Sequence, residues 1–306
     1  MVSLDDFYFM NYGTPKSSER FHNAQIKGGF LAEKRFTHGS TKGKFDAILP
    51  GFSMFNITND EKIAGNQKYI LAAFHQNPED YLVVVSNLMK VDFFEEFFIV
   101  SYSKDTDDWT LHEDYRYGKP EKTITIPRPE FSISKYNREA NSFEVVNISI
   151  FLDNFAPKKL RVGRAPRDLR LYQKFLGNIE LEILDEIYAE RYFIQVLLRN
   201  YKTPMQDFDM FIRLNGKWHL TEIKQKDSDA NDYFGWDTNR IMLYYYVMMK
   251  SNLSGGYLIA EIDNQEDRNH VRWLYIDIEK MLENISWSAP RGTTVMLSRK
   301  HFMEVG

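Results

Sequence analysis

The stretch DFDMFIRLNGKWHLTEIKQK, residues 207–226, decides the fold expected for this chain. Asn215-Gly216 in its middle is the strongest short-range signal for a tight hairpin turn, because both central positions require a positive φ. A hairpin that turns there places Asp209 opposite Glu222 and Asp207 opposite Lys224. Carboxylates and amines therefore converge at one end of the expected strand pair.

The two faces of this hairpin differ in chemistry, because side chains alternate between the faces of a strand. One face carries the charged set with one phenylalanine: Asp207, Asp209, Phe211, Glu222, Lys224 and Lys226. The other carries a core-facing set: Phe208, Met210, Ile212, Leu214, Thr221 and Ile223. Adjacent carboxylates repel, and a divalent cation such as Mg²⁺ removes the conflict. The alternative is a solvated face with an ordinary cross-strand ion pair.

Asp209, followed about a dozen residues later by Glu222-Ile223-Lys224, resembles the signature of the PD-(D/E)XK nuclease superfamily, which includes most type II restriction endonucleases. The resemblance covers roughly residues 178–280. The proline of the signature is missing, since Pro204 lies five residues before Asp209. The resemblance implies an α/β fold, a mixed β-sheet flanked by helices.

The resemblance also implies a site. Asp209 and Glu222, with the Ile223 carbonyl, would hold Mg²⁺, for which Mn²⁺ is expected to substitute. Lys224 would position the attacking water and stabilise charge on the phosphoryl oxygens. Whether Asp207 takes the place of Asp209 stays open.

Residues 178–200 have the apolar periodicity of a helix. Glu190 falls in the middle of the apolar stripe and Glu186 at its edge. A buried acid is costly unless it is paired or bound to a metal. In the resembling family this helix commonly adds an acid to the metal site, so Glu190 is the first choice and Glu186 the second. The alternatives are a partly exposed glutamate that reaches past the edge of the core and a buried ion pair with an arginine.

Composition limits the remaining possibilities. The chain has 306 residues, 43% of them hydrophobic, a net charge of −4 and no cysteine. Disulfides and thiolate zinc sites are excluded, and DNA contacts must come from local basic patches. No signal peptide and no membrane span are expected, so the predicted location is cytoplasmic. HExxH, GxSxG and Walker A motifs are absent.

We expect two domains. Residues 1–155 read as a β-rich domain for DNA recognition, with strands at 81–89, 93–103, 122–127 and 142–152. Residues 156–306 contain the nuclease-like segment. After the hairpin, 227–237 is expected to be a polar link, 236–250 a helix capped by Asp237, 255–263 and 271–278 strands, and 279–284 a short helix.

Basic residues in three regions are the candidates for contacts with the DNA backbone. They lie in a glycine-rich segment, in a basic connector, and on or after the hairpin: Lys34, Arg35, Lys42, Lys44, Arg161, Arg164, Arg167, Arg170, Lys226 and Arg240. A flexible solvated loop and a merely solubilising linker are the alternatives for the first two regions. Arg240 and Tyr244 are one helical turn apart and are otherwise a plain surface pair.

These features together predict a Mg²⁺-dependent endonuclease that cuts double-stranded DNA, and the resemblance implies a type II site-specific enzyme that leaves 5′-phosphate ends. Cutting both strands of a symmetric site favours a homodimer. A structure-directed repair, recombination or transposition nuclease of the same core is the second interpretation. A non-catalytic DNA-binding protein on the same scaffold is the third.

Overall fold

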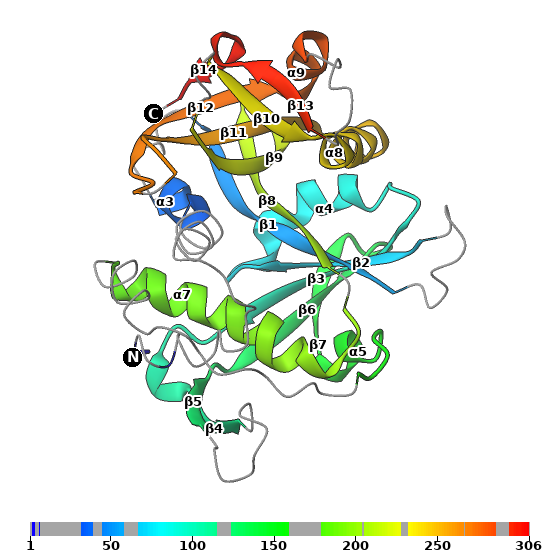
Figure 1. Ribbon diagram of the computed structural model, residues 1–306. Coiled ribbons are helices and arrows are strands. Elements are labelled where there is room, and N and C mark those ends of the chain that lie inside the picture. Colours follow the sequence, from blue (N-terminus) through cyan, green and yellow to red (C-terminus); the bar gives the residue numbers. More distant parts are fainter. Residues whose placement is uncertain are drawn as a thin grey trace.

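The computed structural model describes residues 2–3, 6, 32–38, 45–57, 67–114, 124–158, 179–203, 205–227, 232–265, 267–285 and 294–305. Within these residues the protein is a mixed α/β structure, a large and mostly antiparallel sheet with helices on both faces, as expected (Figure 1). Among the helices of this described part, none is both long enough and apolar enough to cross a membrane.

Ten strands form the large sheet: β1 (Ala47–Asn56), β2 (Tyr69–Phe74), β3 (Phe94–Tyr102), β6 (Phe131–Asn137), β7 (Ser142–Val146), β8 (Met205–Leu214), β9 (Lys217–Lys226), β11 (Ser254–Ile262), β12 (His270–Asp277) and β14 (Met303–Glu304). Their order is β14-β12-β11-β9-β8-β1-β2-β3-β6-β7. The pairs β11–β9 and β2–β3 are parallel and the others antiparallel. Two small sheets pair β4 (Thr110–Asp114) with β5 (Ile124–Arg128) and β10 (Tyr233–Asp237) with β13 (Thr294–Ser298).

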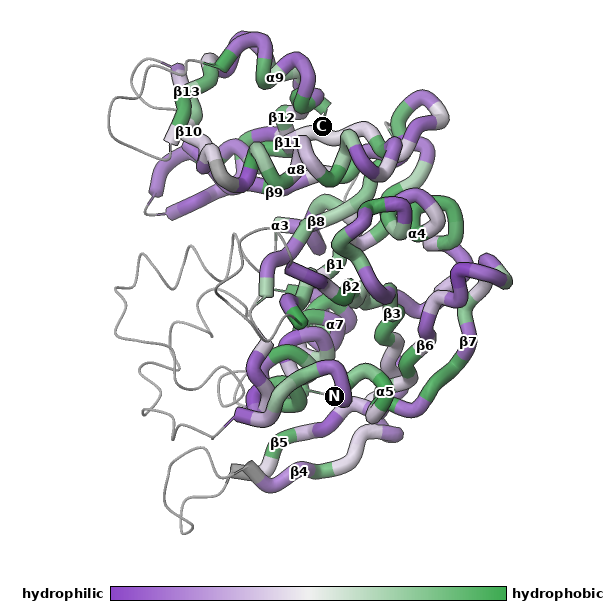
Figure 2. Tube along the Cα trace, turned by 90° about the vertical axis from the view of Figure 1, so that its right-hand side faces the viewer, coloured by the Kyte–Doolittle hydropathy of each residue, from purple (hydrophilic) through white to green (hydrophobic). Residues whose placement is uncertain are grey.

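Helices cover both faces of the sheet: α3 (Ala32–His38), α4 (Leu82–Leu88), α5 (Ile148–Leu152), α7 (Leu181–Tyr192), α8 (Thr238–Ser251) and α9 (Ile278–Asn284). On one face, α4, α8 and α9 bury their apolar residues. The side with α4 and α8 faces the viewer in Figure 2, where α4 is mostly hydrophobic. On the other face lie α3, α5 and the π-helical turn Phe193–Leu197 that continues α7. The predicted helix over 178–200 is thereby confirmed as α7 and the turns that follow it.

The hairpin turn is as predicted. Asn215 and Gly216 have φ values of 51° and 75°, and the β8–β9 ladder runs from Leu214–Lys217 to Met210–Thr221. Past Met210 the two strands separate: β8 continues along β1 to Met205, and β9 continues along β11 to Lys226 (Figure 1). Neither predicted pair, Asp209 with Glu222 or Asp207 with Lys224, belongs to the ladder, because the ladder ends at Met210–Thr221; Asp207 pairs only with Ser53 of β1.

The expected division of the hairpin into a polar and an apolar face is only partly correct. Met210, Ile212 and Ile223 pack in one cluster under α3. Phe208, expected beside them, packs with Phe211 on the opposite face. Both faces are buried because the hairpin lies in the middle of a sheet that helices cover on both sides.

One strand predicted in the N-terminal half is wrong. Within 81–89, residues Leu82–Leu88 form α4, which follows the 3₁₀ turn Pro78–Tyr81. This segment connects the parallel strands β2 and β3, and parallel neighbours need a crossover connection, which is usually a helix. Its apolar residues Val84, Val85 and Leu88 therefore follow a helical spacing onto the core.

The strand predicted over 142–152 is only half correct, and the remaining predicted elements are found with shifted ends. Residues 142–152 form β7 and then α5, which begins after Asn147, whose Oδ1 accepts from the Ser149 N–H at 2.9 Å. The strands at 93–103, 122–127, 255–263 and 271–278 are β3, β5, β11 and β12, and the short helix is α9. The expected link 227–237 contains β10.

The sheet is continuous between the two halves of the chain. β1, from the segment 1–155, pairs along its length with β8, from the segment 156–306. The two expected domains therefore share one sheet, and the proposed site lies beside their junction.

Candidate active site

Asp209 lies where β8 leaves β9. Its Oδ2 accepts a hydrogen bond from the backbone N–H of Ile223 at 2.6 Å, in the place where a ladder bond would otherwise form. Burial raises the pKa of Asp209 well above its ordinary value, the neighbouring Glu222 raises it further, and Lys224 opposes both. The carboxyl is thus held against the strand that carries the second acid.

Gly51 of β1 lets the backbone of β1 approach β8 closely at this position. A Cβ atom built on Gly51 would lie 1.6 Å from the carbonyl oxygen of Phe208 and 2.5 Å from the carbonyl carbon of Asp209. Only glycine allows two backbones to approach so closely. Gly51 therefore fixes where Asp209 sits relative to β9.

Glu222 of β9 is completely buried. Its Oε2 accepts from the Tyr244 hydroxyl at 2.6 Å and from Arg240 Nη2 at 2.8 Å, both on α8. Its Oε1 forms an ion pair with Lys224 Nζ. Three cationic or hydroxyl partners stabilise this carboxylate, as a buried charge requires.

Lys224 links the buried acids to solvent, since 40% of its side chain is exposed. Burial alone would lower its pKa, but the carboxylates of Glu222 and Asp209 outweigh that effect and raise it. The amine therefore stays charged. The structure brings together three of the residues predicted from the signature: Asp209, Glu222 and Lys224.

Arg240, predicted to contact DNA, is bound inside the protein. Besides Glu222 it binds the backbone oxygen of Asp207, and its guanidinium lies 5.4 Å from the ring centroid of Phe208. Tyr244 is fully buried. The pair therefore holds Glu222 in place, which corrects the alternative of a surface pair, and the DNA contact of Arg240 stays a prediction.

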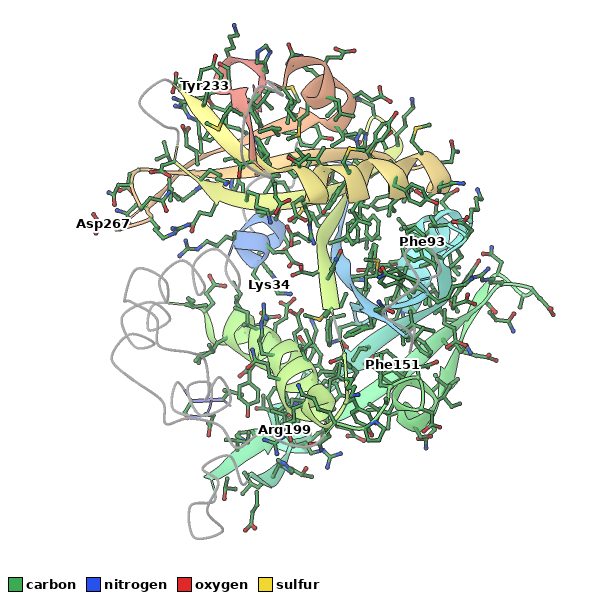
Figure 3. All side chains as sticks on the ribbon, turned by 45° about the vertical axis from the view of Figure 1, so that its right-hand side comes forward. Lys34, Phe93, Phe151, Arg199, Tyr233 and Asp267 are labelled. Atoms are coloured by element: carbon green, nitrogen blue, oxygen red, sulfur yellow. The ribbon has the colours of Figure 1, made fainter. Side chains whose placement is uncertain are left out.

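The helix acids Glu190 and Glu186 have a different partner from the one the resemblance implies. Lys34 of α3 places its Nζ 2.5 Å from Glu190 Oε1 and 2.7 Å from Glu186 Oε1, and α3 lies between α7 and the C-terminal strands (Figure 3). Lys34 is 2% exposed, so its predicted DNA contact is wrong. The buried ion pair, with a lysine rather than an arginine, is what the structure shows.

Glu190 nevertheless lies beside the hairpin acids. It lines a small pocket of about 70 Å³ together with Asp209, Asp207, Glu33 and Arg191. Burial raises the pKa of Glu33 to about 8 and also raises that of Glu190. Acids and two cations, Lys34 and Arg191, thus extend from α7 to the hairpin.

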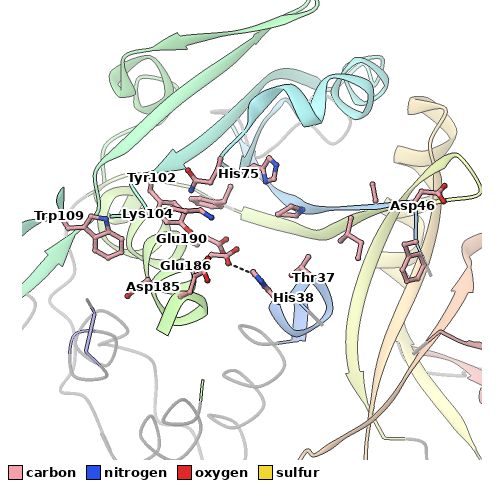
Figure 4. Close-up of a pocket in the computed structure, with 17 residues that line it drawn as sticks. Thr37, His38, Asp46, His75, Tyr102, Lys104, Trp109, Asp185, Glu186 and Glu190 are labelled. Atoms are coloured by element: carbon pink, nitrogen blue, oxygen red, sulfur yellow. Dashed lines mark hydrogen bonds and ion pairs between the residues drawn. The ribbon is translucent and has the colours of Figure 1, made fainter. Parts of the chain in front are cut away.

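A larger pocket of about 790 Å³ lies on the other side of Glu190, between α3, α7 and β1 (Figure 4). Glu182, Asp185 and Glu186 line it, and His38 Nε2 lies 3.0 Å from Glu186 Oε2. Its lining is rich in carboxylates, which makes it poorly suited to a nucleic-acid backbone.

The other predicted DNA contacts are divided between described and undescribed parts of the chain. Arg35 is exposed on α3, and Lys226 is half-buried with its Nζ 6.0 Å from the ring centroid of Trp236. Outside the described residues lie Lys42, Lys44, Arg161, Arg164, Arg167 and Arg170.

The residues present fit a Mg²⁺ ion at the hairpin. Asp209, Glu222 and the Ile223 carbonyl are all oxygen donors, and Glu222 Oε1 is buried without a hydrogen bond of good geometry. The carboxyl of Asp209 is destabilised by Glu222, a conflict that a divalent cation removes. In the described part of the chain, no three or more His, Cys, Asp or Glu side chains cluster as a metal site, so the fit depends on these two carboxylates and a carbonyl.

Comparisons of the chain with protein-family models, with curated proteins and with solved structures found no match. The functional argument therefore depends on the geometry of the hairpin and its surroundings.

Proposed function

We propose that this protein is a Mg²⁺-dependent endonuclease that hydrolyses phosphodiester bonds of double-stranded DNA, with a site-specific, type II restriction-like activity. One observation carries the proposal. Asp209, Glu222 and Lys224, from two strands that separate at this point, converge where the buried carboxylates are in conflict and the amine reaches solvent.

Each residue has a role in the proposed reaction. Asp209, Glu222 and the Ile223 carbonyl would hold Mg²⁺, which supplies Lewis acidity and lowers the pKa of a bound water. Lys224 stays charged and stabilises negative charge on the phosphoryl oxygens while it orients the attacking water. Arg240 and Tyr244 fix the orientation of Glu222 through its Oε2, which leaves Oε1 toward Lys224. The expected products carry 5′-phosphates.

The arrangement of elements around the hairpin supports the proposal. A helix precedes the hairpin, and α8 then crosses over to β11, which runs parallel to β9 beside the acids. Ligands of open α/β sheets commonly bind where such strands end and their connections diverge. The proposal retains the cytoplasmic location and the homodimer that the sequence predicts.

Cleavage of plasmid DNA in Mg²⁺ tests the proposed site. We expect Asp209→Asn and Lys224→Ala to lower the cleavage rate by at least about 100-fold, the size of a lost electrostatic or acid–base contribution, with DNA binding within a few fold of wild type. Lys217→Ala is the matched control, since Lys217 is exposed at the turn end of the same strand. If either site variant nicks plasmid at the wild-type rate, the site assignment is wrong. Discrete fragments from a long DNA cut by the wild type would show sequence specificity rather than structure-directed cutting.

The burial of Glu222 favours a second candidate function. A carboxylate with no exposed surface and three partners also suits a non-catalytic DNA-binding protein in which the acid only stabilises the sheet. Calorimetric titration with Mg²⁺ separates the two. A metal-binding heat that disappears in Asp209→Asn supports the nuclease, and no heat in the wild type supports the binding protein.

A further inference from the structure

A second pocket lies on the α8 side of Lys224. It has a volume of about 290 Å³, near the lower end of the range for small-molecule sites, roughly 300–1,000 Å³. We call this cavity the Trp236 pocket. Strands β8 to β11 and the start of α8 supply its lining residues: Asp207, Lys224, Trp236, Asp237, Arg240 and Tyr257.

Three hydrogen-bond donors of this lining are buried and have no acceptor among the residues that the structure describes. They are the indole Nε1 of Trp236, the hydroxyl of Tyr257 and the guanidinium Nε of Arg240. Trp236 is 3% exposed and Tyr257 is 1% exposed. An unsatisfied buried donor is costly, and most such groups in folded proteins have a partner. Three of them around one cavity indicate that the cavity takes a ligand rich in acceptors.

The positions of these donors are fixed by packing. The ring centroids of Trp236 and Tyr257 lie 4.4 Å apart in an edge-on contact, and Trp236 also stacks on Phe302. Burial raises the pKa of Tyr257, and Glu222 raises it further, so the hydroxyl keeps its proton and remains a donor. Neither ring can turn away to find another acceptor without disturbing this packing.

The lining holds as many cations as acids, and Lys226 lies close to it as a further cation. Lys224 and Arg240 line the cavity, and Lys226 Nζ lies 6.0 Å from the ring centroid of Trp236. Both acids of the lining are already paired: Asp207 Oδ1 lies 3.5 Å from Arg240 Nη2, and Asp237 Oδ1 accepts from the Arg240 N–H at 3.3 Å. The unmet requirement of the pocket is therefore for acceptors, and a phosphate group offers three acceptor oxygens and negative charge.

We propose that the Trp236 pocket is a phosphate-binding subsite that takes the terminal 5′-phosphate of a DNA strand. The phosphate class rests on the unsatisfied donors, whereas its assignment to a DNA strand rests on the proposed function. Lys224 belongs to both the pocket and the hairpin site, so a 5′-phosphate formed at the hairpin would have the pocket directly beside it.

Binding without metal tests this subsite separately from cleavage. Calorimetric titrations in EDTA would use inorganic phosphate, a 5′-phosphorylated oligonucleotide and the same oligonucleotide with a 5′-hydroxyl. Tyr257→Phe and Trp236→Phe each remove one donor and keep an aromatic ring. We expect each to weaken binding of the phosphorylated oligonucleotide roughly tenfold, as loss of one hydrogen bond to a charged group does. Tyr275→Phe is the matched control, because its buried hydroxyl is already bonded to His219 Nδ1 at 2.9 Å.

The outcomes are distinct. Preference for the 5′-phosphate that is lost in Tyr257→Phe and kept in Tyr275→Phe supports the subsite, even if the wild type cuts no DNA. Equal affinity of wild type and Tyr257→Phe for all three probes overturns it, even if the wild type cuts DNA well. Binding of inorganic phosphate through Tyr257 without preference between the oligonucleotides overturns the assignment to a DNA end.

Discussion

At the scale of single residues, Asp209 links stability to the proposed chemistry. Its pKa is raised in the folded protein by burial and then by Glu222, whereas in the unfolded chain it titrates near 3.8. Above pH 4 the unfolded chain therefore loses a proton that the folded protein retains. The contribution of this group to stability is greatest at low pH and falls as the pH rises toward the folded pKa.

Asp209→Asn should remove this loss of stability at high pH, because an amide does not titrate. The amide oxygen still accepts from the Ile223 N–H, so the variant should be more stable than the wild type at pH 8. The gain is about 1.4 kcal/mol for each pH unit by which the folded pKa of Asp209 exceeds its ordinary value, and it is smaller at pH 4. Urea unfolding at both pH values measures the change. Asp153→Asn, at an exposed acid, is the control, and parallel pH profiles for wild type and Asp209→Asn would contradict the prediction.

The contacts of Lys34 could not be predicted from its neighbours in the sequence. Its glycine-rich, basic surroundings suggested contact with phosphate, yet it is buried between acids of α7. Burial alone would lower its pKa, but the carboxylates of Glu190, Glu33 and Glu186 raise it. The only local sign was the apolar pair Ala32 and Phe36 on either side, which places Lys34 on a buried helix.

At the scale of elements, the separation of β8 from β9 shapes the site. Two strands that stayed paired would satisfy their amides with each other, and Asp209 would have no backbone donor. Here β8 follows β1, which Gly51 allows to approach closely, and the Ile223 N–H is left for Asp209. The acids thus lie at a fork between strands rather than on a flat face.

Gly51→Ala should disturb that fork. The new methyl group would clash with backbone atoms of Phe208 and Asp209, which cannot move as a flexible side chain does. We expect destabilisation of about 1–3 kcal/mol and a cleavage rate reduced together with the Mg²⁺ affinity. Gly235→Ala is the control, because its Cβ would meet only side-chain atoms, the nearest at 3.2 Å. Equal stability of the two variants in urea would show that the close approach is unimportant.

At the scale of the whole molecule, the continuous sheet joins the two halves of the chain. β1 and β8 are central strands of one ten-stranded sheet, and a core cluster contains residues from α4 and α8 together. Such shared burial favours cooperative unfolding rather than two independent domains.

Calorimetry of two core variants tests this cooperativity. Phe97→Ala in β3 and Ile259→Ala in β11 each remove a fully buried side chain, at a cost of about 2–5 kcal/mol. We expect a single transition in the wild type, whose midpoint both variants lower. Two transitions, each shifted by only one of the variants, would instead show that the halves unfold separately.

The sequence by itself determined the hairpin, its turn and the two acids and the lysine that form the candidate site. Asn215-Gly216 requires a positive φ, and that local requirement sets the register as far as Met210. The apolar periodicity of α7 and the strands β3, β11 and β12 was likewise readable, because each pattern reflects the geometry of its own backbone.

Only the tertiary structure decided what the charged residues contact. The parallel pairing of β2 and β3 made a helix of 81–89, Lys34 found its partners on a helix about 150 residues away, and Arg240 with Tyr244 came to hold Glu222. The contacts of a charged residue depend on long-range packing. Burial removes water, and a buried charge is costly unless an opposite charge lies next to it. No local sequence pattern specifies contacts between residues so far apart in the chain. The carboxylates could therefore be predicted from the sequence, but the residues that bind them could not.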